Sequence, residues 1–575
     1  MINLTINGQR IAAEEGSTIL EAAKKLHIKI PTLCYHPDQA VKANCRICVV
    51  EVKGQRTLVP ACGYPVSEGM EVETHSPLVR KVRKNILELI LSHHPQDCLK
   101  CSRCGTCELQ EIAYDLGFHQ EPRYDHDVRG MGIDDSSPSI LRDPAKCIAC
   151  GRCEYACSEI QTVHALTKEH RSYESVITTA YNKPLAETVC VNCGQCVQAC
   201  PVGALTVHEE EDVVWDVIEK GGKEVVAQVA PAARITLAEA LGEDPGVVST
   251  GRLVTALKQM GFHKVFDTNF TADLTIMEEG TELLGRLENH GVLPMITSCS
   301  PGWIKFCETF YPELIPNLSS CKSPQAMFGA LLKTYYADKI GKKPEDIYSV
   351  SIMPCTAKKF EAKRPELGRD GYADIDIVLT VQELARMIRS HGIDFENLEE
   401  TPFDDPFGLG SGAGEIFGAT GGVMEAALRT VYEIVTEKPL ASLDFHEVRG
   451  FEGIKTATVQ MGDTAVNVAI AHGLGNARKL MDAVKEGKAR FHFIEVMACP
   501  GGCIGGGGNP VKNWKKMEHR VQAVYNTDLH LPLRKSHENP AVKQLYHDFL
   551  GKPNSTIAHR LLHTHYRDLS ALLRH

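Results

Sequence analysis

The chain opens with alternating apolar and polar residues that predict a β-hairpin. In INLTINGQRI this alternation surrounds Asn7-Gly8, a dipeptide typical of two-residue hairpin turns. Ser17 precedes an amphipathic stretch that runs through Lys25, so we expect Ser17 to cap a short helix. Two strands and a helix are therefore expected before the first cysteine.

Helical periodicity returns in two later stretches. The first predicted helix covers residues 76–92, where Ser76-Pro77 is a typical helix start. Its predicted buried stripe is Leu78, Val82, Ile86 and Ile90. The second, acidic, covers residues 208–220 and stops at Gly221-Gly222, where we place a domain boundary.

Beyond this boundary the pattern changes to strand-like runs that alternate with amphipathic helices. VVAQVAP, FHKVFDTN and VSIMPC are examples of the strand-like runs. This alternation is typical of an α/β domain with largely parallel sheets.

Composition narrows the class of protein. At 575 residues the chain is too long for one core, and its 43% apolar and 23% charged residues are ordinary for a globular protein. A net charge of −11 argues against nucleic-acid binding, which needs a basic surface. The N-terminus lacks a basic region followed by an apolar run, and no stretch of about 18 apolar residues occurs. We therefore expect neither a signal peptide nor a membrane span.

The 22 cysteines carry the strongest chemical signal. Most lie two residues apart in tight clusters, whereas disulfide frameworks are typical of short secreted chains with dispersed cysteines. We therefore expect thiolates that bind metal in a reducing compartment, the cytoplasm.

The first cysteine group follows the predicted hairpin and helix. Ten, two and thirteen residues separate its members, Cys34, Cys45, Cys48 and Cys62. Four thiolates can hold a 2Fe-2S cluster, and a structural zinc is the alternative. Plant-type ferredoxins have a shorter first gap. The spacing instead resembles the N-terminal ferredoxin module shared by iron-only hydrogenases and the large peripheral subunit of respiratory complex I.

The second group has the spacing H-x3-C-x2-C-x5-C and consists of His94, Cys98, Cys101 and Cys107. It resembles the His/Cys3-ligated 4Fe-4S site of the same two families. An imidazole leaves the cluster less negative than a thiolate does, which raises its potential. Cys104 and His93 are alternative ligands because they lie within or beside the motif.

The third and fourth groups both match the bacterial ferredoxin run C-x2-C-x2-C-x3-C. In two-cluster ferredoxins the fourth cysteine of each run ligates the other cluster. One predicted 4Fe-4S ligand set is Cys147, Cys150, Cys153 and Cys200. The other is Cys157, Cys190, Cys193 and Cys196.

Four accessory clusters form an electron conduit, which needs a terminus. Three downstream segments, TSCSPGW, MPCTAKKFE and EVMACPGGCIGGGGNP, resemble the three signatures of iron-only hydrogenases. The order of modules resembles the large clostridial type over essentially the whole chain. The resemblance implies an H-cluster, a 4Fe-4S cubane linked to a di-iron subsite that bears CO, cyanide and azadithiolate. It also implies that the cubane ligands include Cys355, Cys499 and Cys503, of which Cys503 bridges to the di-iron subsite.

The same resemblance implies the walls of the cofactor pocket. Lys358 is suited to hold an anionic cyanide, and methionines beside ligands pack softly against diatomic groups. The remaining implied pocket residues are Pro231, Ala232, Gln325, Met353, Met497 and Phe417. Ala232 replaces a serine of some relatives, which removes one hydrogen bond to cyanide.

A proton relay is implied as well, because splitting dihydrogen releases a proton into a dry pocket. The family relay corresponds to Cys299, Glu279, Glu282, Ser319 and Arg286. Helical spacing allows Glu279, Glu282 and Arg286 to share one helix face. The alternative is a solvated acidic face.

One position departs from the family pattern. The signature TSCCP has a relay cysteine followed by a cubane ligand, and here the second residue is Ser300. In the first hypothesis Cys299 stays in the relay and Ser300, or no residue, completes the cubane. In the second, Cys299 shifts onto iron. Cys321 is a third candidate ligand. We prefer the first because the flanking residues fit without a shift in register.

The predicted fold is a multidomain α+β and α/β chain, in which a β-grasp 2Fe-2S module and two further cluster modules precede an α/β hydrogenase domain. The expected domains are residues 1–76, 77–126, 127–208, 209–527 and a small-subunit-like segment, 528–575. The expected function is hydrogenase, with electrons exchanged with ferredoxin or with flavin, NAD(P)-binding or formate dehydrogenase partner subunits. An electron-transfer subunit and a redox sensor are the alternatives.

Overall fold

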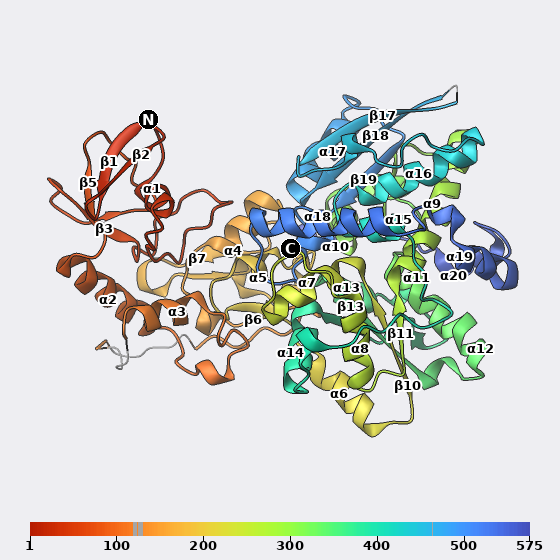
Figure 1. The fold of residues 1–575 in the computed structure, drawn as a ribbon, viewed down its shortest axis with the longest axis horizontal. Helices are drawn as coiled ribbons and strands as arrows, with labels where there is room; N and C mark the ends of the chain where they lie inside the picture. The colour runs from red at the N-terminus through yellow and green to blue at the C-terminus, as the bar shows by residue number, and fades with distance from the viewer. Residues whose placement is uncertain (119–122, 125–129, 463, 575) are drawn as a thin grey trace.

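The computed structural model describes residues 1–118, 123–124, 130–462 and 464–574. The N-terminal cluster modules lie at one end and a larger lobe with two sheets lies at the other (Figure 1). The predicted boundary between residues 126 and 127 lies outside the described residues. No helix in the described ranges is long and apolar enough to cross a bilayer.

The first module contains the predicted hairpin and helix. Strands β1 (Ile2–Ile6) and β2 (Gln9–Ala13) pair antiparallel, and β5 (Glu71–Glu73) runs parallel to β1. Strands β3 (Val49–Val52) and β4 (Val59–Pro60) complete a sheet of order β2-β1-β5-β3-β4 beside helix α1 (Ile19–Lys25). This arrangement confirms the β-grasp expectation.

The predicted cap of α1 was wrong by one residue. Thr18 caps the helix, because its hydroxyl accepts from the Glu21 backbone amide while the Glu21 carboxylate accepts from the Thr18 amide. The Ser17 hydroxyl donates instead to the Glu14 carbonyl.

Helix α2 (Pro77–Leu91) begins at the predicted Ser76 cap, but its buried stripe is shifted by one position. Leu78 is 50% exposed. Arg83 points inward because its guanidinium donates to the Val49 carbonyl, which fixes the rotation of the helix. The buried residues are Val79, Arg83, Leu87 and Leu91.

Short elements hold the remaining cluster segments. Helix α3 (Glu108–Asp115) follows the second cysteine group. The two cysteine runs with the shared spacing contain helices α4 (Arg152–Tyr155) and α5 (Gln195–Ala199). They lie with strands β6 (Ile140–Arg142) and β9 (Leu205–Val207), which pair antiparallel. Strands β7 (Thr167–Glu169) and β8 (Val176–Thr178) form a separate pair.

The larger lobe begins after α6 (Glu211–Lys220), which ends at Gly221 as predicted. Its first sheet has the order β11-β10-β13-β16 and is entirely parallel. The strands are β10 (Glu224–Val229), β11 (Lys264–Asp267), β13 (Ile347–Met353) and β16 (Ile377–Thr380). One face packs on α7 (Pro231–Leu241), α8 (Thr250–Gln259) and α14 (Val381–Ser390), and the other on α9 (Thr268–Glu288) and α11 (Pro324–Leu331).

The second sheet has the order β12-β19-β18-β17. Strands β12 (Met295–Ile296), β19 (Phe493–Met497) and β18 (Thr464–His472) are parallel, and β17 (Ile454–Met461) is antiparallel to β18. The prediction of largely parallel sheets is thus confirmed. Helices around this sheet include α10 (Pro301–Phe310), α16 (Gly422–Thr436) and α17 (Leu474–Lys485).

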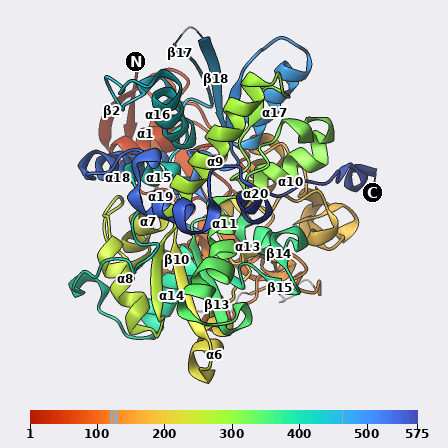
Figure 2. The same cartoon turned by 90° about the vertical axis from the view of Figure 1, so that its right-hand side faces the viewer.

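The C-terminal segment wraps the larger lobe (Figure 2). The predicted boundary between residues 527 and 528 falls within α18 (Trp514–His530), a continuous helix. Beyond it, α19 (Pro540–Leu545) packs on α9 and α20 (Thr556–Leu562) packs on α11. Residues of this segment donate to buried carboxylates of α9: Ser536 and Asn539 to Asp273, and Tyr546 to Glu278.

Candidate cluster sites and active site

The four thiols of the first group lie together beside the β-grasp sheet. The Sγ atoms of Cys48 and Cys62 are 3.4 Å apart, and Cys34 and Cys45 form a second hydrogen-bonded pair. Three of the four side chains are buried and Cys45 is half-buried. The loop geometry therefore brings the predicted 2Fe-2S ligands into one cluster of thiols.

The structure distinguishes the two histidines of the second group. His94 is buried, burial lowers the pKa of its imidazole to about 4, and its Nδ1 atom has no hydrogen-bond partner among the described residues. A metal-binding imidazole must be neutral, so this environment suits a ligand. His93 instead packs edge-on against Tyr173, with ring centroids 3.5 Å apart. The competing thiol of Cys104 is exposed and faces the Gln110 amide.

Each predicted ligand set of the two-cluster module lines its own cavity. The first cavity encloses about 360 Å³ of atom-free space, and its four thiols are Cys147, Cys150, Cys153 and Cys200. The second encloses about 400 Å³, and its four thiols are Cys157, Cys190, Cys193 and Cys196. The fourth cysteine of each run thus lies with the other run, as the ferredoxin pattern predicts.

A larger cavity lies where the parallel strands of both sheets end. It contains about 850 Å³ of atom-free space, its mouth included. Residues directly after β10, β11, β13 and β19 contribute to its wall, which is where ligands bind in open α/β sheets. All of the predicted cofactor-pocket residues line it: Pro231, Ala232, Cys299, Ser300, Gln325, Met353, Cys355, Lys358, Phe417, Met497, Cys499 and Cys503.

The wall also contains residues that sequence reasoning missed. Cys193, a predicted accessory-cluster ligand, lines this cavity as well as its own, and Thr268 and Ala272 enter from α9. No local pattern marks them, because only tertiary folding brings residue 193 beside residue 499.

Lys358 is fixed at the cavity by hydrogen bonds. Its Nζ atom lies 2.8 Å from Glu361 Oε2 and donates to the Cys299 carbonyl at 3.2 Å. The amide of Gln325 donates to the same Glu361 oxygen at 2.9 Å, while its buried Oε1 atom has no partner among the described residues. The site thus presents one ammonium and one amide whose acceptor is unused.

The residues present fit a bound iron cluster. The cavity groups soft thiol donors, which iron–sulfur clusters require, with an ammonium for anionic ligands. Gly502 lines the cavity with a φ of 92°, and a Cβ on it would lie 2.6 Å from the Thr420 amide nitrogen. Glycine is therefore required at that position.

Cys299 and Ser300 both line the cavity. The Ala498 backbone amide donates to the Ser300 hydroxyl at 3.2 Å, next to the predicted ligand Cys499. Cys299 packs among apolar side chains and near Glu279, whose charge adds to burial in raising the pKa of the Cys299 thiol. These contacts suit the first hypothesis, in which Cys299 serves the relay. Cys321 does not line the cavity, although it was a third candidate ligand.

Helix α9 carries the acidic relay residues on one face. Glu282 accepts from the Arg286 guanidinium at 2.6 Å and from the Ser319 hydroxyl at 3.0 Å. Glu279, one turn earlier, is fully buried and its Oε2 atom has no partner among the described residues. A solvated acidic face is thus wrong for Glu279.

Burial is the main cause, and the charge of Glu282 the second, of a pKa of Glu279 raised to about 8. A carboxyl group with this pKa exchanges protons near neutral pH, which suits a relay.

These observations define an iron–sulfur redox protein, in which four groups of cluster-type ligands precede a larger cavity lined by further thiols. Family models match in the same order along the chain. The matches are a 2Fe-2S iron–sulfur cluster binding domain (1–77), the NADH-ubiquinone oxidoreductase-G iron–sulfur binding region (83–122), a 4Fe-4S dicluster domain (146–204), the C-terminal domain of the iron-only hydrogenase large subunit (223–507) and the iron hydrogenase small subunit (515–569).

Relatives match nearly the whole chain. NADP-reducing hydrogenase subunit HndD of Solidesulfovibrio fructosivorans is 49% identical over 98% of this chain and 99% of its own length. Iron hydrogenase 1 of Clostridium pasteurianum is 41% identical over 99% of this chain and its full length. The solved apo [FeFe]-hydrogenase HydA1 of Chlamydomonas reinhardtii is 46% identical, with a TM-score of 0.55 over 60% of this chain and 94% of that one. The chain belongs to the iron-only hydrogenase family, oxidoreductases that act on hydrogen.

Proposed function

We propose that this chain interconverts dihydrogen with protons and electrons at a six-iron H-cluster in the large cavity. Cys355, Cys499 and Cys503 would hold the iron of this cluster, and the four N-terminal ligand groups would hold one 2Fe-2S and three 4Fe-4S clusters that supply the electron path. The observation that carries the proposal is the single cavity whose wall contains all of the predicted cofactor-binding side chains.

When bound, the H-cluster supplies the metal centre at which dihydrogen is split or formed. The protein's part is to hold this centre and exclude water from it. Lys358, fixed by Glu361, places a positive charge toward anionic cyanide. Met353, Met497 and Phe417 provide apolar walls.

Protons travel between the cavity and the surface through side chains of this chain. Cys299 exchanges a proton at the cavity, and Glu279 exchanges it with Cys299 across the buried region. Ser319 joins Glu279 to Glu282, which is 13% exposed and held by Arg286. Ser300, or no residue, would complete the ligands of the cubane, which would leave the Cys299 thiol free for this transfer.

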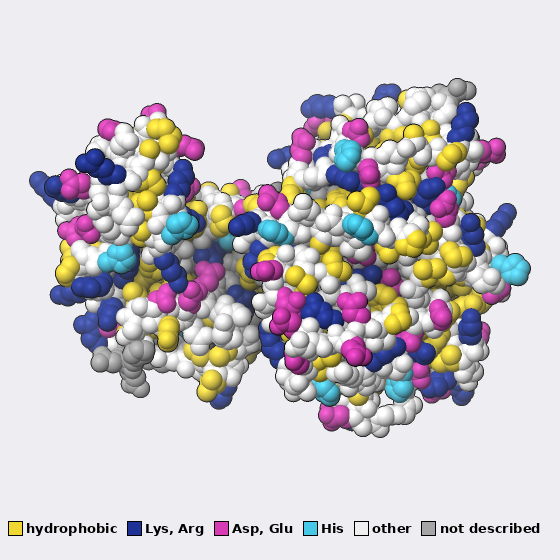
Figure 3. Space-filling view, in the orientation of Figure 1, with side chains coloured by type: hydrophobic (Ala, Val, Ile, Leu, Met, Phe, Trp, Pro, Cys, Tyr) yellow, Lys and Arg dark blue, Asp and Glu magenta, His cyan; other side chains and the backbone are white. Residues whose placement is uncertain are grey.

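Electrons leave or enter through the N-terminal modules, the first of which lies at the end of the molecule away from the larger lobe (Figure 1). The similarity to a subunit of an NADP-reducing hydrogenase favours a flavin and NAD(P)-binding partner subunit over ferredoxin or a formate dehydrogenase. Acidic and basic side chains are interspersed on the face in Figure 3, which shows no continuous basic patch among its described side chains. A cytoplasmic location is part of the proposal, because cluster thiols must stay reduced.

The test is dihydrogen evolution from a reduced dye by the chain matured with the di-iron subsite under anoxia. We expect turnover in the native chain and none in C499A, with accessory-cluster iron retained in both. If a chain with complete clusters showed no turnover, the hydrogenase proposal would be wrong. The two alternatives, an electron-transfer subunit and a redox sensor, would remain. The redox sensor is favoured by one observation, namely that Ser300 stands where the family signature has its second cysteine.

A further inference from the structure

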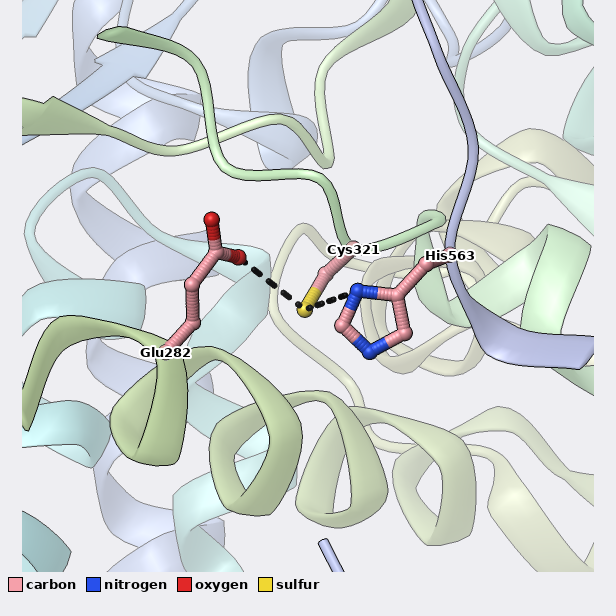
Figure 4. A group of neighbouring side chains, drawn as sticks. All are labelled: Glu282, Cys321 and His563. Carbon is pink, nitrogen blue, oxygen red and sulfur yellow. Dashed lines mark hydrogen bonds between the residues drawn. The ribbon is translucent and has the colours of Figure 1, made fainter. Parts of the chain in front are cut away.

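A further group of side chains that could bind a metal ion lies beside Glu282, at the outer end of the proposed proton relay (Figure 4). Glu282 comes from α9, Cys321 from the loop before α11, and His563 directly follows α20. The Cys321 Sγ atom lies between the other two, 3.8 Å from Glu282 Oε2 and 4.0 Å from His563 Nδ1. The three ligand atoms all lie within 4.8 Å of one another.

This donor set matches the preferences of zinc. Thiolate, imidazole and carboxylate are its usual protein ligands, and bond lengths near 2.0–2.3 Å place tetrahedral ligand atoms about 3.3–3.6 Å apart. The separations at Cys321 exceed this range by only a few tenths of an ångström. Small rotamer adjustments would therefore complete three corners. A hydroxyl is available for the fourth, because Ser320 Oγ lies 2.8 Å from His563 Nδ1 and 3.2 Å from Glu282 Oε2.

The histidine is already oriented by an outer carboxylate. His563 Nε2 lies 3.1 Å from Glu278 Oε2, and Glu278 in turn accepts from the Tyr546 hydroxyl and the Asn554 amide. Both side chains of the His563–Glu278 pair are almost completely buried. With the Nε2 proton on this bond, Nδ1 has a lone pair and lies 2.8 Å from the Ser320 hydroxyl and 4.0 Å from the Cys321 Sγ atom. A carboxylate behind a histidine is the arrangement that orients zinc ligands in proteins.

The Cys321 thiol is surrounded by negatively charged carboxylates. Burial raises the pKa of the Cys321 thiol well above its usual range, and the charges of Glu282, Glu279 and Glu278 raise it further. Such surroundings disfavour a bare thiolate but attract a dication, which would neutralise the thiolate on binding. Glu282 is partly exposed and gives the ion a route from solvent.

We propose that Glu282, Cys321 and His563 form a binding site for a thiophilic divalent cation of the zinc type. Binding forms one sulfur–metal bond and releases the Cys321 thiol proton to solvent, with no electron transferred. An ion bound there occupies the Glu282 carboxylate and so interrupts the proton relay. This inhibitory consequence rests on the proposed function, whereas binding itself does not.

The binding test uses the matured holoenzyme, loaded with ZnCl2 under anoxia and desalted. We expect zinc to be retained in the native chain and lost in C321S and H563Q, with iron per chain unchanged. The matched control is C307A, because Cys307 is buried on α10 and contacts the Tyr311 carbonyl instead. An anomalous signal at the zinc edge would locate the ion. Zinc retained by C321S, or no zinc retained by the native chain, overturns the site.

The inhibition test measures dihydrogen evolution against zinc concentration. We expect the half-inhibitory concentration to rise at least about tenfold in C321S, relative to its own zinc-free rate, and to stay unchanged in C307A. Because one proton is released, apparent affinity should tighten about tenfold per pH unit. If zinc bound at this site without slowing turnover, the zinc site would be supported and the role of Glu282 in the relay would be contradicted. If E282Q lost turnover and the native chain bound no zinc, the role of Glu282 in the relay would be supported and the zinc site would be contradicted.

Discussion

The Cys499 Sγ atom lies 4.0 Å from the carbonyl oxygen of Cys193, so the catalytic cavity and the last accessory-cluster segment touch. The Thr356 hydroxyl reinforces this contact by donating to the Asn192 carbonyl at 2.7 Å. No further protein layer separates the predicted ligands of the two clusters at this point. The electron path into the cavity therefore depends on how closely these two backbone segments pack.

Gly194 provides a test of that packing. Its φ is 68°, and a Cβ would lie 2.5 Å from Thr356 Oγ1 and 3.0 Å from the Gly507 Cα. We expect G194A to lower the thermal unfolding midpoint and to slow dye-driven dihydrogen evolution. The matched control is G8A, because Gly8 has φ of 79° but no atom within 4 Å of a built Cβ. G8A should cost only about 1–2 kcal/mol for its backbone conformation. Equal effects in the two variants would contradict a packing role for Gly194.

The fourth cubane corner can be assigned by comparing C299S with S300C. If Ser300 occupies the corner, C299S should keep cubane iron in chains produced without the di-iron subsite, and should lose most turnover after maturation. S300C should shift the cubane potential, because a thiolate is a softer donor than a hydroxyl group. Iron analysis and a redox titration followed by EPR measure both effects. Cubane iron lost from C299S would instead place Cys299 on iron.

His94 should be the nitrogen ligand of the second cluster. H94A should lose the iron of that cluster and its EPR signal, because the substitution removes the buried imidazole donor. H94C should retain the iron and lower the potential, because a thiolate makes the cluster more negative. H93A is the control, because the ring of His93 packs against Tyr173. A loss of cluster iron confined to H93A would reverse the assignment.

Glu279 should make stability depend on pH. Its pKa is about 8 in the folded chain and near 4.5 when unfolded, so the folded state holds a proton that the unfolded state releases. Its contribution to stability is fully present below the unfolded pKa and is lost as pH rises through about 8. Relative to wild type, E279Q should therefore gain up to about 1.4 kcal/mol per pH unit between about pH 6 and 8. Unfolding of both proteins across this range measures the difference, and parallel curves would show that Glu279 is ionised in the fold.

The grouping of the thiols in the two-cluster module was predictable from the sequence because the spacing within each run is local. Loops that place Cys147, Cys150 and Cys153 around one cavity are encoded in the two-residue gaps between them. The shared helix face of Glu279 and Glu282 is likewise a consequence of helical periodicity alone.

Other features depend on contacts between distant segments and left no local signal. Helix α2 presents Val79 rather than Leu78 to the core because the Arg83 guanidinium donates to the Val49 carbonyl of strand β3. Cys193 reaches the catalytic cavity, and His563 reaches Cys321, only through tertiary packing. Ser17 was predicted as the cap in place of Thr18 because two adjacent hydroxyl residues give nearly the same sequence signal.

The wrapping of α9 by the C-terminal segment has a consequence for biosynthesis. Asp273 and Glu278 leave the ribosome long before Asn539 and Tyr546, which donate hydrogen bonds to them. Until those donors are translated, the nascent lobe has carboxylates that lack part of their hydrogen bonding and favour hydration over burial. The buried carboxylates of α9 therefore complete their hydrogen bonding only after the C-terminal segment has been translated.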